Sequence, residues 1–542
     1  GEKYVQWNAD QFENNPASLK VSADHIPQHD LIFTVIVAGE DSDGDGVLDS
    51  ADAFPFDPAA SIDADSDGKP DDWNTGYSEA DSTSSPQLTL DEDDDGDGVP
   101  DISDYAPKNS EVQYATLKQA YDGLENSSLQ ACIQSQNPSL SQVTNLFEIN
   151  CQNQALYREI GSLAGLAAFP NIERLYLTQI GNLKKLDELR RLSQLREFVY
   201  LESPNSVNTL WPLSGLQFLE RFEIQESVIR AEGLANLDLP SLSRLRLGSD
   251  LRDLAFLSQF PRLEALLLNG NAISDFSAIK GLSELTELSF ADNAIPLTDL
   301  SILNGSKLKF VALQQMGITS LESMPASGSI EFLSLQGNQI TNLDGLQGLS
   351  GLLQTLEFLD NPVSNLSPIR NLRVQNLWLG RTNITDLEPI SEMTELKAIH
   401  LDGVQVASLE PLVGLPNLVE LYADGPTAFD SAEVSKLTGL KKLGFKFQQL
   451  ETLDGLADLT QLQFLDAANN ELKSITALRG FSDLTWLSLE RNQISLIGNA
   501  LENMEVGPVR LSYNPILCSE IDALSASRGG QLDIVFESEC VE

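Results

Sequence analysis

Basic side chains and histidines are scarce in this chain of 542 residues, which holds 34 Lys and Arg and 3 His against 80 Asp and Glu. The formal net charge of −46 excludes a basic groove for nucleic acid and argues against docking on anionic lipid. His25, His29 and His400 assemble neither a zinc set nor a Ser/His/Asp arrangement. We therefore expect a protein that is not an enzyme and that binds no nucleic acid.

Cysteine is rare as well. The four cysteines form two sequence-local pairs, Cys132 with Cys151 and Cys518 with Cys540, separated by 19 and 22 residues. Their placement suggests two local disulfides formed in an oxidising compartment, although four cysteines allow three connectivities. The alternative is four buried thiols.

Long apolar runs are missing. No stretch of 18 or more apolar residues occurs, so the sequence predicts no transmembrane span. No secretory signal is visible, and a strand-like stretch, 31–37, lies close to Gly1, so we expect a processed or trimmed chain. A chain of 542 residues is too long for one compact core. Several domains or an elongated repeat array must therefore bury its hydrophobic residues, which make up 42% of the chain.

A leucine pattern, L-x-x-L-x-L-x-x-N-x-I, recurs from Ile172 onward with a period close to 22. It is clearest in 263–273 (LEALLLNGNAI) and 484–494 (LTWLSLERNQI). Sixteen units follow one another at spacings of 21 to 24 residues, which chance does not produce. Their first positions are 172, 195, 219, 242, 263, 285, 308, 330, 353, 374, 396, 418, 440, 462, 484 and 506.

This is the leucine-rich-repeat pattern, and the second halves of units such as 384–390 (ITDLEPI) and 409–415 (LEPLVGL) resemble the internalin-like bacterial subclass. The resemblance covers roughly residues 140–540. It implies an α/β-type solenoid, with a concave parallel sheet and an outer face of short helical or extended segments. Sixteen strands about 4.8 Å apart give an arc on the order of 70 Å long.

The ninth position of the unit is where asparagine turns the chain and hydrogen-bonds the backbone of neighbouring turns. Other units carry Thr382, Val404, Pro426 or Gln448 there, and we expect the ladder to be interrupted at those places. The asparagines that fit are Asn271, Asn293, Asn338, Asn361, Asn470, Asn492 and Asn514.

Solenoid ends would expose leucines, so terminal caps are needed for solubility. The cysteine pairs lie where caps belong: a helical stretch around 115–134 with 143–151 at the entrance, and 518–540 at the exit. We therefore divide the chain into a β segment (1–39), an acidic segment (40–110), an N-terminal cap (111–171), the repeats (172–516) and a C-terminal cap (517–542).

Residues 40–104 hold 22 acidic residues and one basic residue, Lys69. Three stretches, starting at 41, 63 and 93, share the template D-x-D-x-D-G-x-x-D-x-x-D/N. Side-chain oxygens at positions 1, 3, 5, 9 and 12, Gly at 6 and a backbone carbonyl at 7 wrap one calcium ion. The predicted ligands of about three Ca²⁺ ions are Asp41, Asp43, Asp45, Val47, Asp49, Asp52, Asp63, Asp65, Asp67, Lys69, Asp71, Asn74, Asp93, Asp95, Asp97, Val99, Asp101 and Asp104.

No flanking helix pair is evident, so the loops do not indicate a sensor-type EF-hand. They resemble thrombospondin type 3 repeats of bacterial surface proteins, in which calcium stiffens a linker; the cysteines of the animal versions are missing here. The alternative is a disordered acidic linker. Before it, 3–8 and 29–37 predict two strands, either the remnant of an upstream immunoglobulin-like domain or a small sheet packed on the calcium segment.

Positions three, five and seven of the unit face solvent on the concave sheet, because strand side chains alternate. Position three carries Phe310 and Phe332, then Phe464 and Trp486, in adjacent units, and position five carries Trp378, His400 and Tyr422 in three consecutive units. Such a stripe is enriched in protein interfaces and would equally stack sugar rings. The alternatives are ring pairs that only stabilise the sheet, or a terminal domain that folds over them.

Acidic neighbours of this stripe, Asp402, Glu420, Asp424 and Asp466, favour a partner with positive charge or a bridging calcium ion. Together with the resemblance, the stripe predicts an extracellular binding or adhesion protein, on the outer surface of a Gram-negative bacterium, that recognises a protein or glycan. The alternative is a calcium-dependent structural subunit of a surface layer or filament, which contacts copies of itself.

Overall fold

The computed structural model divides into two compact units. One comprises 1–123, 141–145 and 165–170, and the other comprises 124–140, 146–164 and 171–542. The structure describes residues 19–20, 32–33, 41–96, 100–101, 108, 114–152, 155–180, 183, 185–201, 210–225, 234, 237–248, 251–293, 296–425, 431–504, 507–528, 532–536 and 540–542.

The larger unit is built on a parallel sheet in which each strand from β3 to β20 pairs with the next strand of the chain. Sixteen of these described strands, β4 to β19, come one each from the sixteen predicted repeats, and β3 and β20 come from the predicted caps. The strands are β3 (Glu148–Cys151), β4 (Arg174–Thr178), β5 (Glu197–Leu201), β6 (Arg221–Ile224), β7 (Arg244–Leu247), β8 (Ala265–Leu267), β9 (Glu287–Ser289), β10 (Phe310–Ala312), β11 (Phe332–Ser334), β12 (Leu352–Glu357), β13 (Arg373–Trp378), β14 (Ala398–His400), β15 (Glu420–Tyr422), β16 (Lys442–Gly444), β17 (Phe464–Asp466), β18 (Trp486–Ser488), β19 (Gly507–Arg510) and β20 (Leu532–Val535).

The repeat leucines form the interior of the solenoid. In the unit of β18, Leu484, Leu487 and Leu489 are at most 1% exposed. Strand pairing keeps the repeat register, so that Leu465 lies beside Leu487 and equivalent leucines stack from unit to unit. Each buried leucine contributes about 2 kcal/mol of apolar burial, which no single unit achieves alone.

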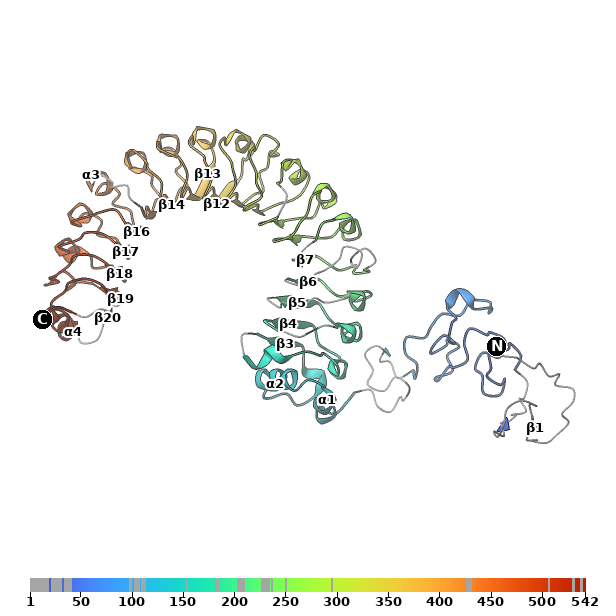
Figure 1. The fold of residues 1–542 in the computed structure, drawn as a ribbon. Helices are drawn as coiled ribbons and strands as arrows, with labels where there is room; N and C mark the ends of the chain where they lie inside the picture. The colour runs from blue at the N-terminus through green and yellow to red at the C-terminus, as the bar shows by residue number, and fades with distance from the viewer. Residues whose placement is uncertain are drawn as a thin grey trace, which may run out of the picture. The chain divides into compact units, whose positions relative to one another are not determined.

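The outer side of the arc carries short 3-10 helices, while the strands line its inner side (Figure 1). Within the two second halves of units named above, 384–390 and 409–415, Glu388–Ile390 forms η14 and Glu410–Leu412 forms η15, each with proline in the first turn, where its missing N–H costs no bond. Among the residues that the structure describes, the other 3-10 helices of this unit are η4 (Ala155–Glu159), η6 (Asp187–Arg191), η7 (Trp211–Leu213), η9 (Ala255–Gln259), η10 (Ser277–Gly281), η11 (Leu300–Leu303), η12 (Asp344–Gly348), η13 (Ser367–Ile369), η16 (Asp454–Leu456) and η17 (Thr476–Gly480).

The asparagine ladder is confirmed for all seven predicted asparagines. Asn492, for example, donates from Nδ2 to the carbonyl of Ala467 in the preceding unit, at 3.0 Å, and accepts the N–H of Leu472 at 3.0 Å. The other six make equivalent bonds.

The predicted interruptions of the ladder are confirmed only in part. Thr382 bonds a carbonyl of its own unit, Leu379, at 2.7 Å. Gln448 still donates from Nε2 to the carbonyl of Ala423 in the preceding unit, because its longer side chain spans the gap, but its Oε1 is buried without a hydrogen-bond partner among the described residues, so only the donor half of the ladder contact is kept there. Pro426 lies outside the described residues.

Both cysteine pairs form the local disulfides, Cys132–Cys151 and Cys518–Cys540, with Cα–Cα distances of 5.9 Å and 5.0 Å. The first joins helix α2 (Ser127–Gln136) to β3, and the second joins the start of helix α4 (Cys518–Arg528) to the segment after β20. The predicted helical stretch around 115–134 is two helices, because Asn126 caps α2 by accepting the N–H of Leu129 at 3.0 Å. Helix α3 (Ser431–Val434) lies on the outer side of the arc (Figure 1).

The smaller unit contains the acidic segment, the antiparallel pair β1 (Leu19–Lys20) and β2 (Ile32–Phe33), η2 (Glu79–Asp81), helix α1 (Leu117–Gly123), η3 (Val143–Asn145) and η5 (Leu166–Ala168). Strand β2 lies within the predicted strand 29–37, and the predicted strand 3–8 lies outside the described residues. None of the described helices is long and apolar enough to cross a membrane.

Candidate functional site

Two regions of the molecule gather polar or aromatic side chains in an ordered way: the acidic loops of the smaller unit and the concave sheet of the larger unit. The acidic loops share one backbone arrangement. The carboxylate at position nine accepts the N–H of position two in each loop: Asp49 from Ser42 at 2.7 Å, Asp71 from Ala64 at 2.8 Å and Asp101 from Asp94 at 2.7 Å. The glycines at position six, Gly46 and Gly68, have φ of 99° and 94°, a conformation that favours glycine.

Carboxylates gather inside the first two loops. Asp41, Asp43 and Asp45 each offer an oxygen within 4.8 Å of the others, and so do Asp63, Asp65 and Asp67. Of the predicted ligands, Asp97, Val99 and Asp104 lie outside the described residues.

Several buried carboxylate oxygens of this segment have no hydrogen-bond partner. They are Oδ2 of Asp43, Asp52 and Asp91 and Oδ1 of Asp94, and the last three residues are at most 9% exposed. Burial and the neighbouring Asp101 raise the pKa of Asp94 to about 7. An unpartnered buried oxygen is costly, and a bound cation would supply the missing partner. The residues present therefore fit hard-cation binding.

Contacts join successive loops. Asn74, at position twelve of the second loop, donates to Asp45 of the first loop at 2.6 Å, and Lys69 lies 2.6 Å from Asp67 and 2.9 Å from Asp91. A β-carbon at Gly96 would stand 2.6 Å from Oδ2 of Asp65. The template describes one loop at a time, so it could not reveal contacts between loops. It also missed the buried Asp91 and Asp94, which do not occupy its ligand positions.

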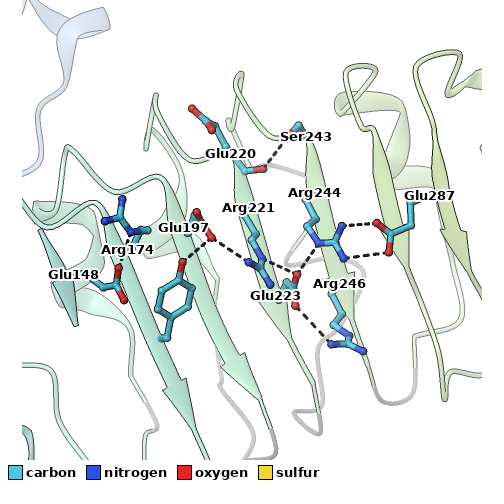
Figure 2. A network of polar contacts seen from close by, with 11 residues as sticks. Glu148, Arg174, Glu197, Glu220, Arg221, Glu223, Ser243, Arg244, Arg246 and Glu287 are labelled. Carbon is cyan, nitrogen blue, oxygen red and sulfur yellow. Dashed lines mark hydrogen bonds and ion pairs between the residues drawn. The ribbon is translucent and has the colours of Figure 1, made fainter. Parts of the chain in front are cut away.

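On the concave sheet, strands β3 to β9 carry a ladder of alternating acidic and basic side chains that the sequence analysis missed (Figure 2). Arg174 bonds Glu148 at 2.9 Å, and Arg221 bonds Glu197 at 3.1 Å. Arg244 reaches across β8 to Glu287 with two bonds, at 2.5 Å and 3.2 Å, because only Ala265 lies between them.

Glu223 is the centre of this charge ladder and is 1% exposed. Arg221 and Arg244 each donate to it at 2.8 Å, and Arg246 lies 3.6 Å away (Figure 2). Burial raises the pKa of the Glu223 carboxyl, but the two arginine bonds outweigh burial, so its pKa is lower than usual. Every acid of the ladder has a basic partner, which makes this half of the sheet electrostatically satisfied.

The seven predicted aromatic positions are half-buried and lie in register on strands β10 to β18. Their rings stack nearly parallel, with centroid distances of 3.7 Å for Trp378 and His400 and 4.6 Å for His400 and Tyr422. Phe464 and Trp486 stack at 4.1 Å, and the separate pair Phe310 and Phe332 stacks at 4.3 Å.

One continuous ladder of five rings results, from Trp378 on β13 to Trp486 on β18. Tyr422 and Phe464, on strands that flank β16, are 6.2 Å apart and tilted by 60°. They meet because β16 has Gly444 beside Tyr422, where a β-carbon would stand 2.6 Å from the ring. At the far end, the guanidinium of Arg510 lies over Trp486, 5.9 Å from the ring centroid.

An acidic surround flanks the ladder of five rings. In the repeat units whose first positions run from 353 to 506, positions three, five and seven carry six acidic and three basic side chains: Glu357, Asp402, Glu420, Asp424, Asp466 and Glu490 against Lys442, Lys446 and Arg510. Lys442 pairs with Glu420 at 2.8 Å, and Lys446 pairs with Asp424 at 2.8 Å. No ion pair of the described residues reaches Glu357, Asp402 or Glu490. Burial lowers the pKa of His400, against a smaller opposing effect of the nearby acids.

No family model matches the chain. It is 27% identical over 237 residues to tubulin-folding cofactor E of Arabidopsis thaliana, a match that covers 38% of this chain and 44% of that protein. The chain spans about half the length of the curated relatives it matches.

Among solved structures, the chain is similar to a chain of the mouse RP105/MD-1 complex, with a TM-score of 0.54 and 19% identity over 69% of this chain and 77% of that one. An internalin, InlF of Listeria monocytogenes, matches 78% of this chain and 92% of that one at 17% identity, with a TM-score of 0.26. The chain has the leucine-rich-repeat fold, and the predicted solenoid is confirmed.

Proposed function

We propose that this chain is an extracellular recognition or adhesion protein that binds a protein partner through the concave face between β13 and β18. The observation that carries the proposal is the continuous ladder of five half-buried rings from Trp378 to Trp486. Stacked rings on a solvent-facing sheet supply a large, rigid apolar surface, which is typical of protein interfaces.

Ring geometry favours a protein over a glycan. A sugar binds an aromatic residue by lying on its face, but within the three-ring and two-ring stacks the facing ring faces cover one another at 3.7 Å to 4.6 Å, and the ring of Phe464 is tilted against Tyr422 at 6.2 Å. The inner rings, such as His400, therefore offer edges to the partner. Side chains and backbone of a protein can pack against a row of edges, whereas a pyranose ring cannot stack on it.

We also propose that bound calcium ions stiffen the smaller unit. The fit of the acidic loops to a hard cation supports it, with Asp41, Asp43 and Asp45 as ligands of the first loop and Asp63, Asp65 and Asp67 of the second. The unpartnered buried oxygens of Asp52, Asp91 and Asp94 add donors from neighbouring positions. Bound calcium would neutralise the segment and hold the loops together.

An extracellular location is supported by the two disulfides, which persist in oxidising compartments. The resemblance of the repeats and acidic loops to bacterial surface proteins supports a location on the outer surface of a bacterium, and we propose that the bacterium is Gram-negative.

Site-specific photocrosslinking tests the function. A benzoylphenylalanine at Asn376, on the concave face of β13, should crosslink a protein from the native cell surface in the presence of calcium. The same probe at Glu392, which is exposed between η14 and β14, is the matched control and should give no such product. Equal crosslinking from both positions, or a product that survives protease but not glycosidase treatment, would contradict a protein partner on this face.

A further inference from the structure

The two ends of the ring ladder differ. At the β18 end, the outer face of Trp486 carries the guanidinium of Arg510, 5.9 Å from the centroid. At the β13 end, the described residues place no cationic group over Trp378. The neighbour of Trp378 on β12 is Glu357, in direct strand register.

Glu357 is a half-exposed carboxylate with no ion pair to a described lysine or arginine. It therefore lies beside the indole of Trp378. His400 stacks on one face of this indole at 3.7 Å, and the other face lies on the side of Glu357. An indole face and a carboxylate attract the same group, a cation, and a planar guanidinium satisfies both by stacking and pairing.

We propose that Trp378 and Glu357 form a binding site for an arginine or lysine side chain of the partner. The inference rests on the proposed function and names the chemistry that the concave face recognises. The protein itself places a cation over a ring face at the other end of the ladder, where the guanidinium of its own Arg510 lies over Trp486. The acidic surround, with Asp402 also lacking an ion pair among the described residues, strengthens the attraction for a basic segment.

A partner-free titration tests the site. The chain has five tryptophans, so 5-fluorotryptophan labelling gives few ¹⁹F signals, and Trp378→Phe and Trp486→Phe assign the two that matter. The probe is a blocked Gly-Arg-Gly peptide at low ionic strength, and its neutral match is Gly-citrulline-Gly. The Trp378 signal should shift saturably with the arginine peptide and remain unmoved by the citrulline peptide or by methyl glucoside.

Variants sharpen the titration. Glu357→Gln should weaken binding of the arginine peptide roughly three- to tenfold, since it removes the ion pair and leaves the ring. Glu392→Gln, which removes an exposed acid between η14 and β14, away from the concave face, is the matched control and should leave the affinity unchanged. Arg510→Ala should make the Trp486 signal respond to the peptide as well, because it uncovers an equivalent ring face.

An unmoved Trp378 signal, an equal shift with citrulline, or no effect of Glu357→Gln would each overturn the inference. Because the titration needs no natural partner, its result is independent of the crosslinking test. A responsive Trp378 without crosslinking at Asn376 would refute the proposed function alone, and crosslinking with an unresponsive Trp378 would refute the cation site alone.

Discussion

The ring of Tyr422 occupies the space that a side chain on Gly444 would fill. These two residues are direct partners on neighbouring strands, and a β-carbon at Gly444 would stand 2.6 Å from Cδ1 of Tyr422. The missing side chain lets Tyr422 lean across β16 toward Phe464, which joins a three-ring stack to a two-ring stack. A glycine therefore determines the length of the aromatic surface.

Replacing Gly444 by alanine should separate the two stacks. The added methyl group must displace the Tyr422 ring, so we expect a loss of about 1–3 kcal/mol in the free energy of unfolding and weaker partner binding. Denaturant unfolding measures the first effect. Gly480→Ala, where a β-carbon meets nothing within 4 Å, is the matched control and should leave stability nearly unchanged. Equal losses in both variants would show that the Tyr422 contact is unimportant.

Removing the Glu223 carboxylate should destabilise the entrance half of the solenoid. Glu223→Ala leaves Arg221 and Arg244 without their shared buried acceptor, and we expect a loss on the order of 2–4 kcal/mol. Glu220→Ala, which removes a pair between exposed side chains of Glu220 and Arg196, should cost less than about 1 kcal/mol. Thermal melting of both variants makes the comparison, and similar melting temperatures would refute the central place of Glu223 in the charge ladder.

Stability should fall on acidification partly because of His400. Burial holds its pKa below the ordinary value of 6.5 in the folded protein, so the folded state binds the proton less readily than the unfolded chain. The contribution of His400 is complete above the unfolded pKa and is lost as the pH falls through the folded pKa. We expect His400→Phe, which keeps a stacked ring, to show a smaller drop in melting temperature between pH 7.5 and 5.5 than the unmodified protein. An identical drop would argue against this titration.

Chelation should loosen the acidic segment and leave the solenoid intact. Without cations, the buried oxygens of Asp52, Asp91 and Asp94 lack partners, so amides of residues 41–101 should lose protection from hydrogen exchange when calcium is removed. Amides of β4 to β19 serve as the internal control and should not change. Asp43→Asn should weaken calcium binding roughly tenfold, and Asp81→Asn, whose carboxylate bonds Ser78 outside the three loops, should not. If hydrogen exchange of these amides is the same with and without chelator, calcium does not stiffen the acidic segment.

Much of the solenoid could be predicted because its physics repeats. A strand that buries leucines at fixed positions fixes which side chains face solvent, so the concave placement of Trp378, His400 and Tyr422 followed from counting alone. The asparagine ladder followed for the same reason, since each amide meets the same backbone groups one unit away.

What could not be predicted depends on contacts between units of unequal sequence. The bond from Arg244 to Glu287 spans two strands and exists because Ala265 between them is small. The meeting of Tyr422 and Phe464 depends in the same way on an absent side chain at Gly444. In the acidic segment, the template assigned Asn74 to its own loop, whereas its amide lies against Asp45 of the preceding loop. A single-unit pattern carries no information about such neighbours.

The most direct test of the central claim is the affinity of the crosslinked partner, once isolated, for the double variant Trp378→Ala/Tyr422→Ala, measured by calorimetric titration with calcium present. Both rings are half-buried on the concave face, so the variant should fold, which its circular dichroism and melting curve verify. We expect a loss of affinity of at least about a hundredfold, because two central aromatic residues of an interface are removed. An unchanged Kd in a folded double variant would contradict recognition by this face.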